Sequence, residues 1–128
     1  MSSATFDPRR DQITVRVELV GPQAVVEARL LLDTGAAYSM VHPLLLTRIG
    51  VDVTAPRSNI RIATVTHIRT APLYIVPEVR SFGVSRNRVP VLGQPLPTAS
   101  RLDGLLGLNF FRGYRLTIDL RSGTIEME

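Results

Sequence analysis

The sequence contains no cysteine, no lysine and no tryptophan, and it has only two histidines. Without cysteine there is no disulfide, thiol nucleophile or thiolate metal site, and two histidines are too few for a typical zinc site. Without lysine there is no Schiff-base chemistry and no P-loop lysine for nucleotide phosphates. We therefore expect no metal, no cofactor and no nucleotide hydrolysis.

Long hydrophobic runs are also missing. The apolar stretches fall far short of the ~20 residues that cross a bilayer, and no apolar stretch follows the charged residues near the N-terminus, as a secretory signal would require. These patterns predict a soluble, cytoplasmic protein. At 128 residues, 45% of them hydrophobic, the chain is long enough for one globular domain and too short for two catalytic lobes. We expect an N-terminal arm over residues 1–11 and a single domain over residues 12–128.

Basic residues exceed acidic ones, with a net charge of +4 and a pI near 10.6. All fifteen basic residues are arginines, scattered from Arg9 to Arg121, and only Arg9 and Arg10 are adjacent. Nucleic-acid binding needs clustered cations and usually aromatic residues for base stacking, and aromatics make up only 5% of this chain. The pattern favours a solvated basic surface over a nucleic-acid partner.

The hydrophobic pattern is mainly that of β-strands. Residues 12–20 alternate between apolar and polar side chains, as a half-buried strand does. Residues 24–32 become steadily more apolar and end in Leu30-Leu31-Leu32, which indicates a strand that runs from the surface into the core. Residues 43–50 read as a short helix, with Pro43 at its start and Gly50 just past its end.

Further along the chain, residues 59–79 predict a β-hairpin bounded by Pro56 and Pro77. Residues 80–101 are rich in Pro, Gly, Ser and Arg, so we expect a long surface connection there, with one strand near residues 89–92. Residues 102–112 predict a short buried turn that leads into a helix, and residues 114–127 a closing hairpin. The predicted fold is mainly β, with one or two short helices.

Asp33 stands at the buried end of the second predicted strand, followed by Thr34 and Gly35. An unpaired carboxylate is costly to bury, so Asp33 needs either compensation or a polar cleft. Thr34 supplies a hydroxyl, and the amide of Gly35 can approach the carboxylate closely. Such a turn holds a carboxyl group rigidly, although Asp-Thr-Gly also occurs as an ordinary turn.

A second apolar segment, Leu105-Leu106-Gly107, ends in glycine and precedes Leu108-Asn109-Phe110-Phe111. Glycine at such a position lets a strand lie directly beneath another turn. Plain core packing before a helix would explain the same residues. Together with Asp33-Thr34-Gly35, the segment favours a catalytic turn supported from below.

The order of these features resembles the retropepsin-like aspartic proteases, the single-domain family of retroviral proteases and their bacterial relatives. The resemblance covers an apolar strand into Asp33-Thr34-Gly35-Ala36, Ser39, a hairpin at the flap position, Leu105-Leu106-Gly107 and a short helix. It implies a closed β-barrel of the acid-protease type. It also implies that Asp33 is the catalytic acid or base, that Thr34 makes a hydrogen-bonded grip across a dimer, and that Gly35 shapes the turn. The residues implied to contact substrate are Ala36, Ala63, Thr64, Val65, Thr66, Leu106 and Gly107.

One feature departs from the family pattern. The family flap is usually rich in glycine at its tip, whereas residues 63–68 contain none, so the tip is expected to be stiffer or differently placed. His67 lies at this tip, where an exposed histidine without a role is the simplest interpretation. His42 precedes Pro43 and is most simply the residue at which the helix begins.

Peptide hydrolysis by this chemistry needs two carboxyl groups that share a proton around a water molecule. Asp52, Asp103 and Asp119 lack the Thr-Gly context, so only Asp33 qualifies. The partner carboxylate is therefore expected from a second copy across a two-fold axis, with residues 1–11 and 124–128 as candidate interface segments. The sequence predicts a homodimeric aspartic endopeptidase acting on peptides or proteins. The alternative is a weakly active or inactive module of the same fold that binds peptides or assembles with a partner.

Overall fold

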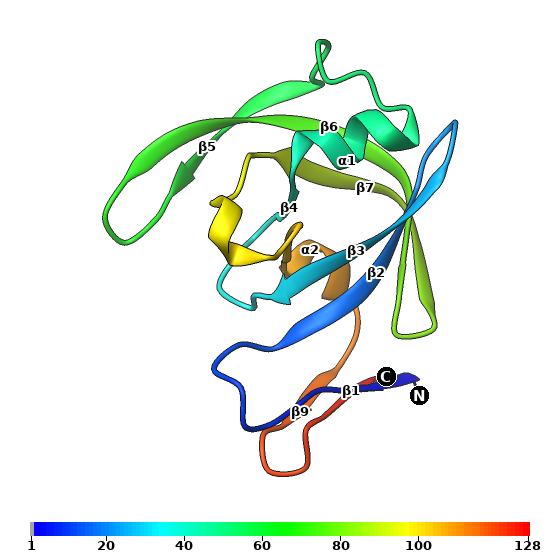
Figure 1. The fold of residues 1–128 in the computed structure, drawn as a ribbon, viewed down its shortest axis with the longest axis vertical. Coiled ribbons are helices and arrows are strands. Elements are labelled where there is room, and N and C mark those ends of the chain that lie inside the picture. The colour runs from blue at the N-terminus through cyan, green and yellow to red at the C-terminus, as the bar shows by residue number, and fades with distance from the viewer. Residues whose placement is uncertain (1) are drawn as a thin grey trace.

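The computed structural model describes residues 2–128, apart from the side chain of residue 98. In chain order the elements are β1 (Ser2–Thr5), β2 (Thr14–Val20), β3 (Val25–Leu32), β4 (Ser39–Val41), α1 (Pro43–Ile49), β5 (Ser58–Ala63), β6 (Ile68–Ser81), β7 (Val84–Gly93), a 3-10 turn (Thr98–Ser100), β8 (Gly104–Leu106), α2 (Leu108–Phe111), β9 (Leu116–Asp119) and β10 (Thr124–Met127). The protein is mainly β, with two short α-helices, as the sequence predicts (Figure 1).

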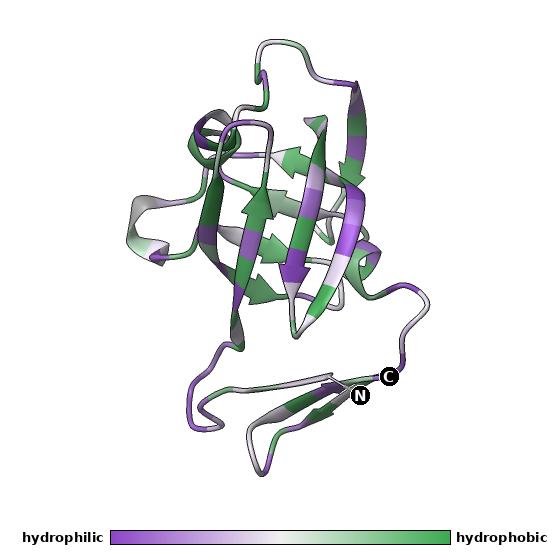
Figure 2. Ribbon diagram, turned by 90° about the vertical axis from the view of Figure 1, so that its right-hand side faces the viewer, coloured by the Kyte–Doolittle hydropathy of each residue, from purple (hydrophilic) through white to green (hydrophobic). Residues whose placement is uncertain are grey.

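Six strands form a closed barrel. Their order is β2-β3-β8-β4-β7-β6, and β6 pairs again with β2 through Glu18↔Arg80, Leu19↔Val79 and Val20↔Glu78. The alternation along β2 buries Val15, Val17 and Leu19 and exposes the residues between them. Bands of hydrophilic and hydrophobic residues alternate along the strands in Figure 2. The closed barrel that the family resemblance implies is confirmed.

Helix α1 packs against the barrel through Leu45, Leu46 and Ile49, which are buried. The helix begins after His42, whose Nδ1 accepts a hydrogen bond from the amide of Leu44 at 3.1 Å. It ends at Gly50, whose φ of 93° is the left-handed conformation that glycine adopts readily. The predicted boundaries of this helix, and the role of His42 in starting it, are confirmed.

The hairpin of β5 and β6 extends beyond the barrel. Strand β5 pairs only with β6, from Ser58↔Leu73 to Ala63↔Ile68, and Figure 1 shows the pair arching away from the closed sheet. A small apolar cluster joins the hairpin to β7. It consists of Ala71 and Leu73 of β6 and Leu92 of β7, and Ile60 and Ile62 of β5 pack against it. The predicted hairpin is present, and β5 is left with one open edge.

The long surface connection expected over residues 80–101 is wrong for residues 80–93, although the strand expected near residues 89–92 is present as part of β7. Strands β6 and β7 instead form one long hairpin, paired down to Ser81↔Val84. Its turn has positive φ at both Phe82 (57°) and Gly83 (69°), as the hairpin turns that match strand twist require. Phe82 is an unusual residue there, and it is buried against Phe110 and Phe111 with ring centroids 6.5 and 5.9 Å away. This packing compensates for the unfavourable backbone conformation.

The two ends of the chain meet in a separate three-stranded sheet of order β1-β10-β9. Strand β1 pairs with β10 from Ser2↔Met127 to Thr5↔Thr124, and Figures 1 and 2 show this sheet beside the barrel. Residues 2–5 of the predicted N-terminal arm therefore form a paired strand. Ile125 and Met127 of β10 are buried and belong to the main core.

Candidate active site

Asp33 follows directly on β3 and is held by its neighbours. Its amide donates to the carbonyl of Leu106 at 3.0 Å, and its Oδ1 accepts from the amide of Gly35 at 2.9 Å. The Oδ2 atom has no hydrogen-bond partner within residues 2–128. One carboxylate oxygen is thus fixed by the backbone, and the other is left for a group outside the turn.

Strand β8 lies between the two strands that flank the Asp33 turn. It pairs in parallel with β3, Leu32 opposite Leu106, and antiparallel with β4, Met40 opposite Leu105. Immediately after β8 the chain passes so close to the turn that a Cβ atom on Gly107 would lie 2.6 Å from the carbonyl oxygen of Tyr38 and 2.8 Å from that of Ala36. Gly107 is required for this approach, which explains the Leu-Leu-Gly segment singled out in the sequence.

A polar network beneath the turn joins Ser39 to Asn109. The Oδ1 of Asn109 accepts from the amide of Ser39 at 2.9 Å and from its hydroxyl at 2.8 Å. The Ser39 Oγ accepts from the amide of Gly107 at 3.0 Å, and the Nδ2 of Asn109 donates to the carbonyl of Pro90 at 2.7 Å. Because Ser39 is only 2% exposed, these bonds satisfy groups that water cannot reach. The network locks β4, β7 and α2 under Asp33.

Sequence reasoning missed the role of Asn109. The sequence feature that could have indicated this role is that Asn109 is the one polar side chain between Leu105 and Phe111. A lone amide in an apolar segment must find partners when it is buried, but its partners here lie far away in sequence.

Replacing Asn109 by Leu should destabilise the fold by about 2–3 kcal/mol, because the buried amide and hydroxyl of Ser39 and the carbonyl of Pro90 lose their partner. The measurement is urea unfolding, with Asn87→Leu as the matched control, since Asn87 is exposed on β7. Equal unfolding midpoints for the two variants would show that the network contributes nothing to stability.

A cleft of about 510 Å³ lies in front of Asp33, between the turn and the β5–β6 hairpin. Its walls are largely apolar, and Asp33 and Arg61 are the only charged residues that line it among residues 2–128. The full lining is Asp33, Gly35, Ala36, Ala37, Tyr38, Met40, Arg61, Ile62, Ala63, Thr64, Val65, Leu92 and Leu105. A channel of this kind suits an extended peptide next to a carboxylate.

The structure brings only some of the predicted substrate contacts to this cleft. Ala36, Ala63, Thr64 and Val65 line it, whereas Thr66 is exposed at the hairpin tip. Leu106 is 1% exposed and its side chain belongs to the core, so Leu105 faces the cleft in its place. Gly107 is buried behind the turn.

The hairpin tip closes without glycine. The amide of Thr64 donates to the carbonyl of His67 at 2.8 Å, and the Thr64 Oγ1 accepts from the amide of His67 at 3.0 Å. The hydroxyl thus takes the place of the carbonyl that would complete an ordinary two-residue turn. Val65 at the tip is fully exposed. His67 is also exposed and contacts the hydroxyl of its neighbour Thr66 at 2.7 Å.

The other candidate aspartates serve local structure. Asp52 accepts from the hydroxyl and amide of Thr54, and these bonds lower the pKa of its carboxyl. The amides of Ser122 and Arg121 likewise lower the pKa of Asp119 at the β9–β10 turn. Asp103 accepts from the amide of Arg29 at 2.8 Å. Asp33 is the only acidic residue that lines the cleft among residues 2–128.

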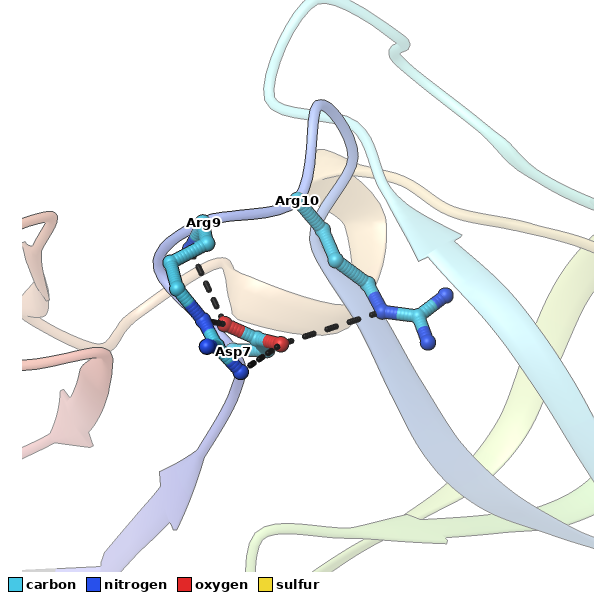
Figure 3. A network of polar contacts seen from close by, with 3 residues as sticks. All are labelled: Asp7, Arg9 and Arg10. Carbon is cyan, nitrogen blue, oxygen red and sulfur yellow. Dashed lines mark hydrogen bonds and ion pairs between the residues drawn. The ribbon is translucent and has the colours of Figure 1, made fainter.

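The loop between β1 and β2 carries an ion-pair cluster (Figure 3). Arg9 donates to both carboxylate oxygens of Asp7, at 3.0 and 3.2 Å, and Arg10 lies 4.0 Å from the same carboxylate. These hydrogen bonds to Arg9 lower the pKa of Asp7. All three residues lie outside the lining of the cleft, and the adjacent Arg9 and Arg10 are at least partly neutralised by this acid.

Residues 2–128 hold no group of three His, Asp or Glu side chains that could bind a metal ion. No helix in this range has the length and apolar character needed to cross a bilayer.

Comparison with solved structures supports the fold. A retropepsin-like aspartic protease from Rickettsia conorii superposes with a TM-score of 0.67 at 16% sequence identity, with 98% of each chain covered. At this identity the likeness concerns the fold alone. No curated protein matches the sequence closely enough to count as a relative. The family model described as "Aspartyl protease" matches residues 7–110, a span that includes the Asp33 turn, the hairpin and Gly107, and the chain therefore belongs to the aspartyl protease family.

Proposed function

We propose that this protein is an aspartic endopeptidase that acts as a homodimer, with one Asp33 from each subunit. The observation that carries the proposal is Asp33 itself, held by Gly35 and facing an apolar cleft beneath a hairpin. In the proposed reaction a water molecule lies between two Asp33 carboxyls that share one proton. The ionised carboxyl draws a proton from the water as the water oxygen attacks the carbonyl carbon of the scissile peptide, while the other carboxyl protonates the carbonyl oxygen. The carboxyl that took the proton then gives it to the amide nitrogen as the C–N bond breaks, and the other carboxyl takes back a proton from the departing diol, which leaves as a carboxylic acid.

The free groups of the turn support a second copy. The Asp33 Oδ2 and the Thr34 hydroxyl have no hydrogen-bond partner within residues 2–128, and Thr34 is exposed. A two-fold axis beside the turn would place identical groups opposite each other. Thr34 then forms a hydrogen bond with the equivalent turn of the second subunit. Residues 1–11 and 124–128 are candidates for the remaining contacts between the subunits. The proposal is tested by incubating the purified protein with a diverse peptide mixture and identifying the products by mass spectrometry.

Activity should depend on dimer formation. Because one chain supplies only one suitable carboxyl, the specific activity per chain is expected to fall on dilution in parallel with the dimer fraction measured by sedimentation. Mixing wild-type protein with an Asp33→Asn excess should inhibit further by forming mixed dimers. Undiminished activity per chain from a monomer would contradict the two-carboxyl mechanism.

The rate should follow a bell-shaped pH profile, because only a carboxyl pair that holds one proton can act as acid and base together. We expect kcat/KM to fall at low pH, where both carboxyls are protonated, and to fall again at higher pH, where both are ionised. The measurement is a pH series on one peptide, with the dimer content checked at each point. A rate that rises steadily into alkaline pH would indicate a different base.

A second candidate function is a peptide-binding or assembly module without strong activity. The feature that favours it is the hairpin tip, which Thr64 closes without glycine and which leaves Val65 exposed. A stiff lid would bind a peptide yet close poorly over it. Peptide binding without hydrolysis by the wild-type dimer would support this alternative.

A further inference from the structure

Arg61 lies on the open edge of the hairpin that covers the cleft. Strand β5 is the last strand of its sheet and pairs on one side only. Residues 61 to 65, along β5 and into the tip, line the cleft in front of Asp33. One wall of the cleft is therefore a strand edge, to which an extended peptide can add as a further strand.

The register of the hairpin determines which residues present their backbone to that edge. Thr64 donates to His67 across the turn, and hydrogen-bonded pairs alternate along an antiparallel ladder. The pair Arg61↔Thr70 is therefore of the non-hydrogen-bonded kind. The amide and carbonyl of Arg61 point away from β6, toward the open edge, where a peptide strand would bind them.

The charge of the Arg61 side chain has no paired carboxylate among the residues that the structure describes. Its neighbour across the ladder is Thr70, and the diagonal neighbours Ile68 and Pro72 are also uncharged. No carboxylate lies within ion-pair distance of Arg61 among residues 2–128, and the side chain is exposed. Within the described part of the chain, the only other charged residue that lines the cleft is Asp33.

We propose that Arg61 is a specificity-determining residue that selects an acidic side chain at one position of the bound peptide. A peptide residue opposite Arg61 on the open edge directs its side chain to the same face of the sheet as Arg61. A Glu or Asp at that peptide position forms a cross-strand ion pair with Arg61. The peptide residues two positions before and after it point to the same face of the sheet. This inference rests on the proposed function in one respect: the peptide that binds along β5 is taken to be the substrate.

The test uses short apolar peptides in which each position in turn is Glu, Gln or Lys. Binding is measured by fluorescence anisotropy to the Asp33→Asn protein, and kcat/KM is measured with the wild type. Each subunit of the proposed homodimer carries one Arg61, so the preference is expected at the position opposite Arg61 of either subunit. At these positions Glu should be preferred over Gln by about two- to fivefold, the size of an exposed cross-strand ion pair. The preference should weaken at high salt.

Variants of Arg61 assign the preference to that side chain. With Arg61→Gln the Glu/Gln ratio should fall to about one, and with Arg61→Glu it should reverse and favour Lys over Gln, whereas Arg61→Lys should retain part of the preference. The control Arg121→Gln removes the same charge from an exposed residue of the β9–β10 turn and should leave the ratio unchanged. Thermal melting of each variant checks that it is folded.

The outcomes separate this inference from the proposed hydrolysis. A Glu preference in binding without any cleavage would support the role of Arg61 and refute the protease. Cleavage of all peptides with no Glu preference at any position, or a preference that survives in Arg61→Gln, would refute the role of Arg61 and leave the protease standing. The absence of all peptide binding would overturn both.

Discussion

Replacing Asp33 by Asn is expected to lower the rate of peptide hydrolysis by at least about a thousandfold, because the amide can neither accept nor deliver the shared proton. The fold should survive the change. Asn has nearly the same volume, and its carbonyl oxygen can still accept the hydrogen bond that Gly35 donates to Oδ1. Melting temperature and dimer content should therefore stay close to those of the wild type.

The matched control is Asp52→Asn, the same chemical change in an exposed loop where Asp52 binds Thr54. It should leave turnover within about twofold of the wild type, since exposed substitutions away from a site have small effects. Hydrolysis by the Asp33→Asn protein at the wild-type rate would refute the assignment of Asp33 as the catalytic carboxyl. Equal losses in both variants would indicate that the assay reports folding and not catalysis.

The second large effect is expected from Gly107→Val. The added side chain would meet the carbonyl groups of Tyr38 and Ala36, since a Cβ atom there lies only 2.6 and 2.8 Å from their oxygens. These contacts involve backbone, which cannot rotate away as a flexible side chain does. We expect a loss of about 3 kcal/mol in the free energy of unfolding, and a loss of hydrolysis as the Asp33 turn is displaced.

The control for this prediction is Ala37→Val, which adds a branched side chain at an exposed position of the loop between β3 and β4 that Gly107 approaches. Urea unfolding should show a small change for Ala37→Val and a large one for Gly107→Val. Because the Asn109 Oδ1 and the Gly107 amide both bind Ser39, the effects of Gly107→Val and Asn109→Leu should not be additive. Unchanged stability of the Gly107→Val protein would mean that β8 does not approach the turn as described.

Local patterns in the sequence were sufficient for several elements. Residues 12–20 alternate with the period of a strand, and β2 buries the predicted face. Helix α1 has Pro43 at its start and Gly50 at its end. Each of these residues favours the backbone conformation of its own position, so no distant contact is needed. Asp33 was singled out by the Asp-Thr-Gly order and its resemblance to a known family. The hydrogen bond from Gly35 to Asp33 lies within the turn, and the catalytic role of Asp33 stays a prediction.

Prediction failed where a distant contact overrode a local preference. Residues 80–101 have the composition of a loop, yet β7 forms because it pairs with β6 along most of its length. Phe82 disfavours a positive φ, and only its burial against Phe110 and Phe111 accounts for that turn. The pairing of β1 with β10 likewise joins the two ends of the chain.

The sequence by itself determined the mainly β character, the helix at Pro43 and the turn from Asp33 to Gly35, since each depends on periodicity or on bonds between near neighbours. Only the tertiary structure decided what surrounds Asp33. The parallel register of β8 with β3 turns Leu105 toward the cleft and Leu106 into the core, because neighbouring residues of a strand point to opposite faces. The same register brings Gly107 and Asn109 beneath the turn and onto Ser39.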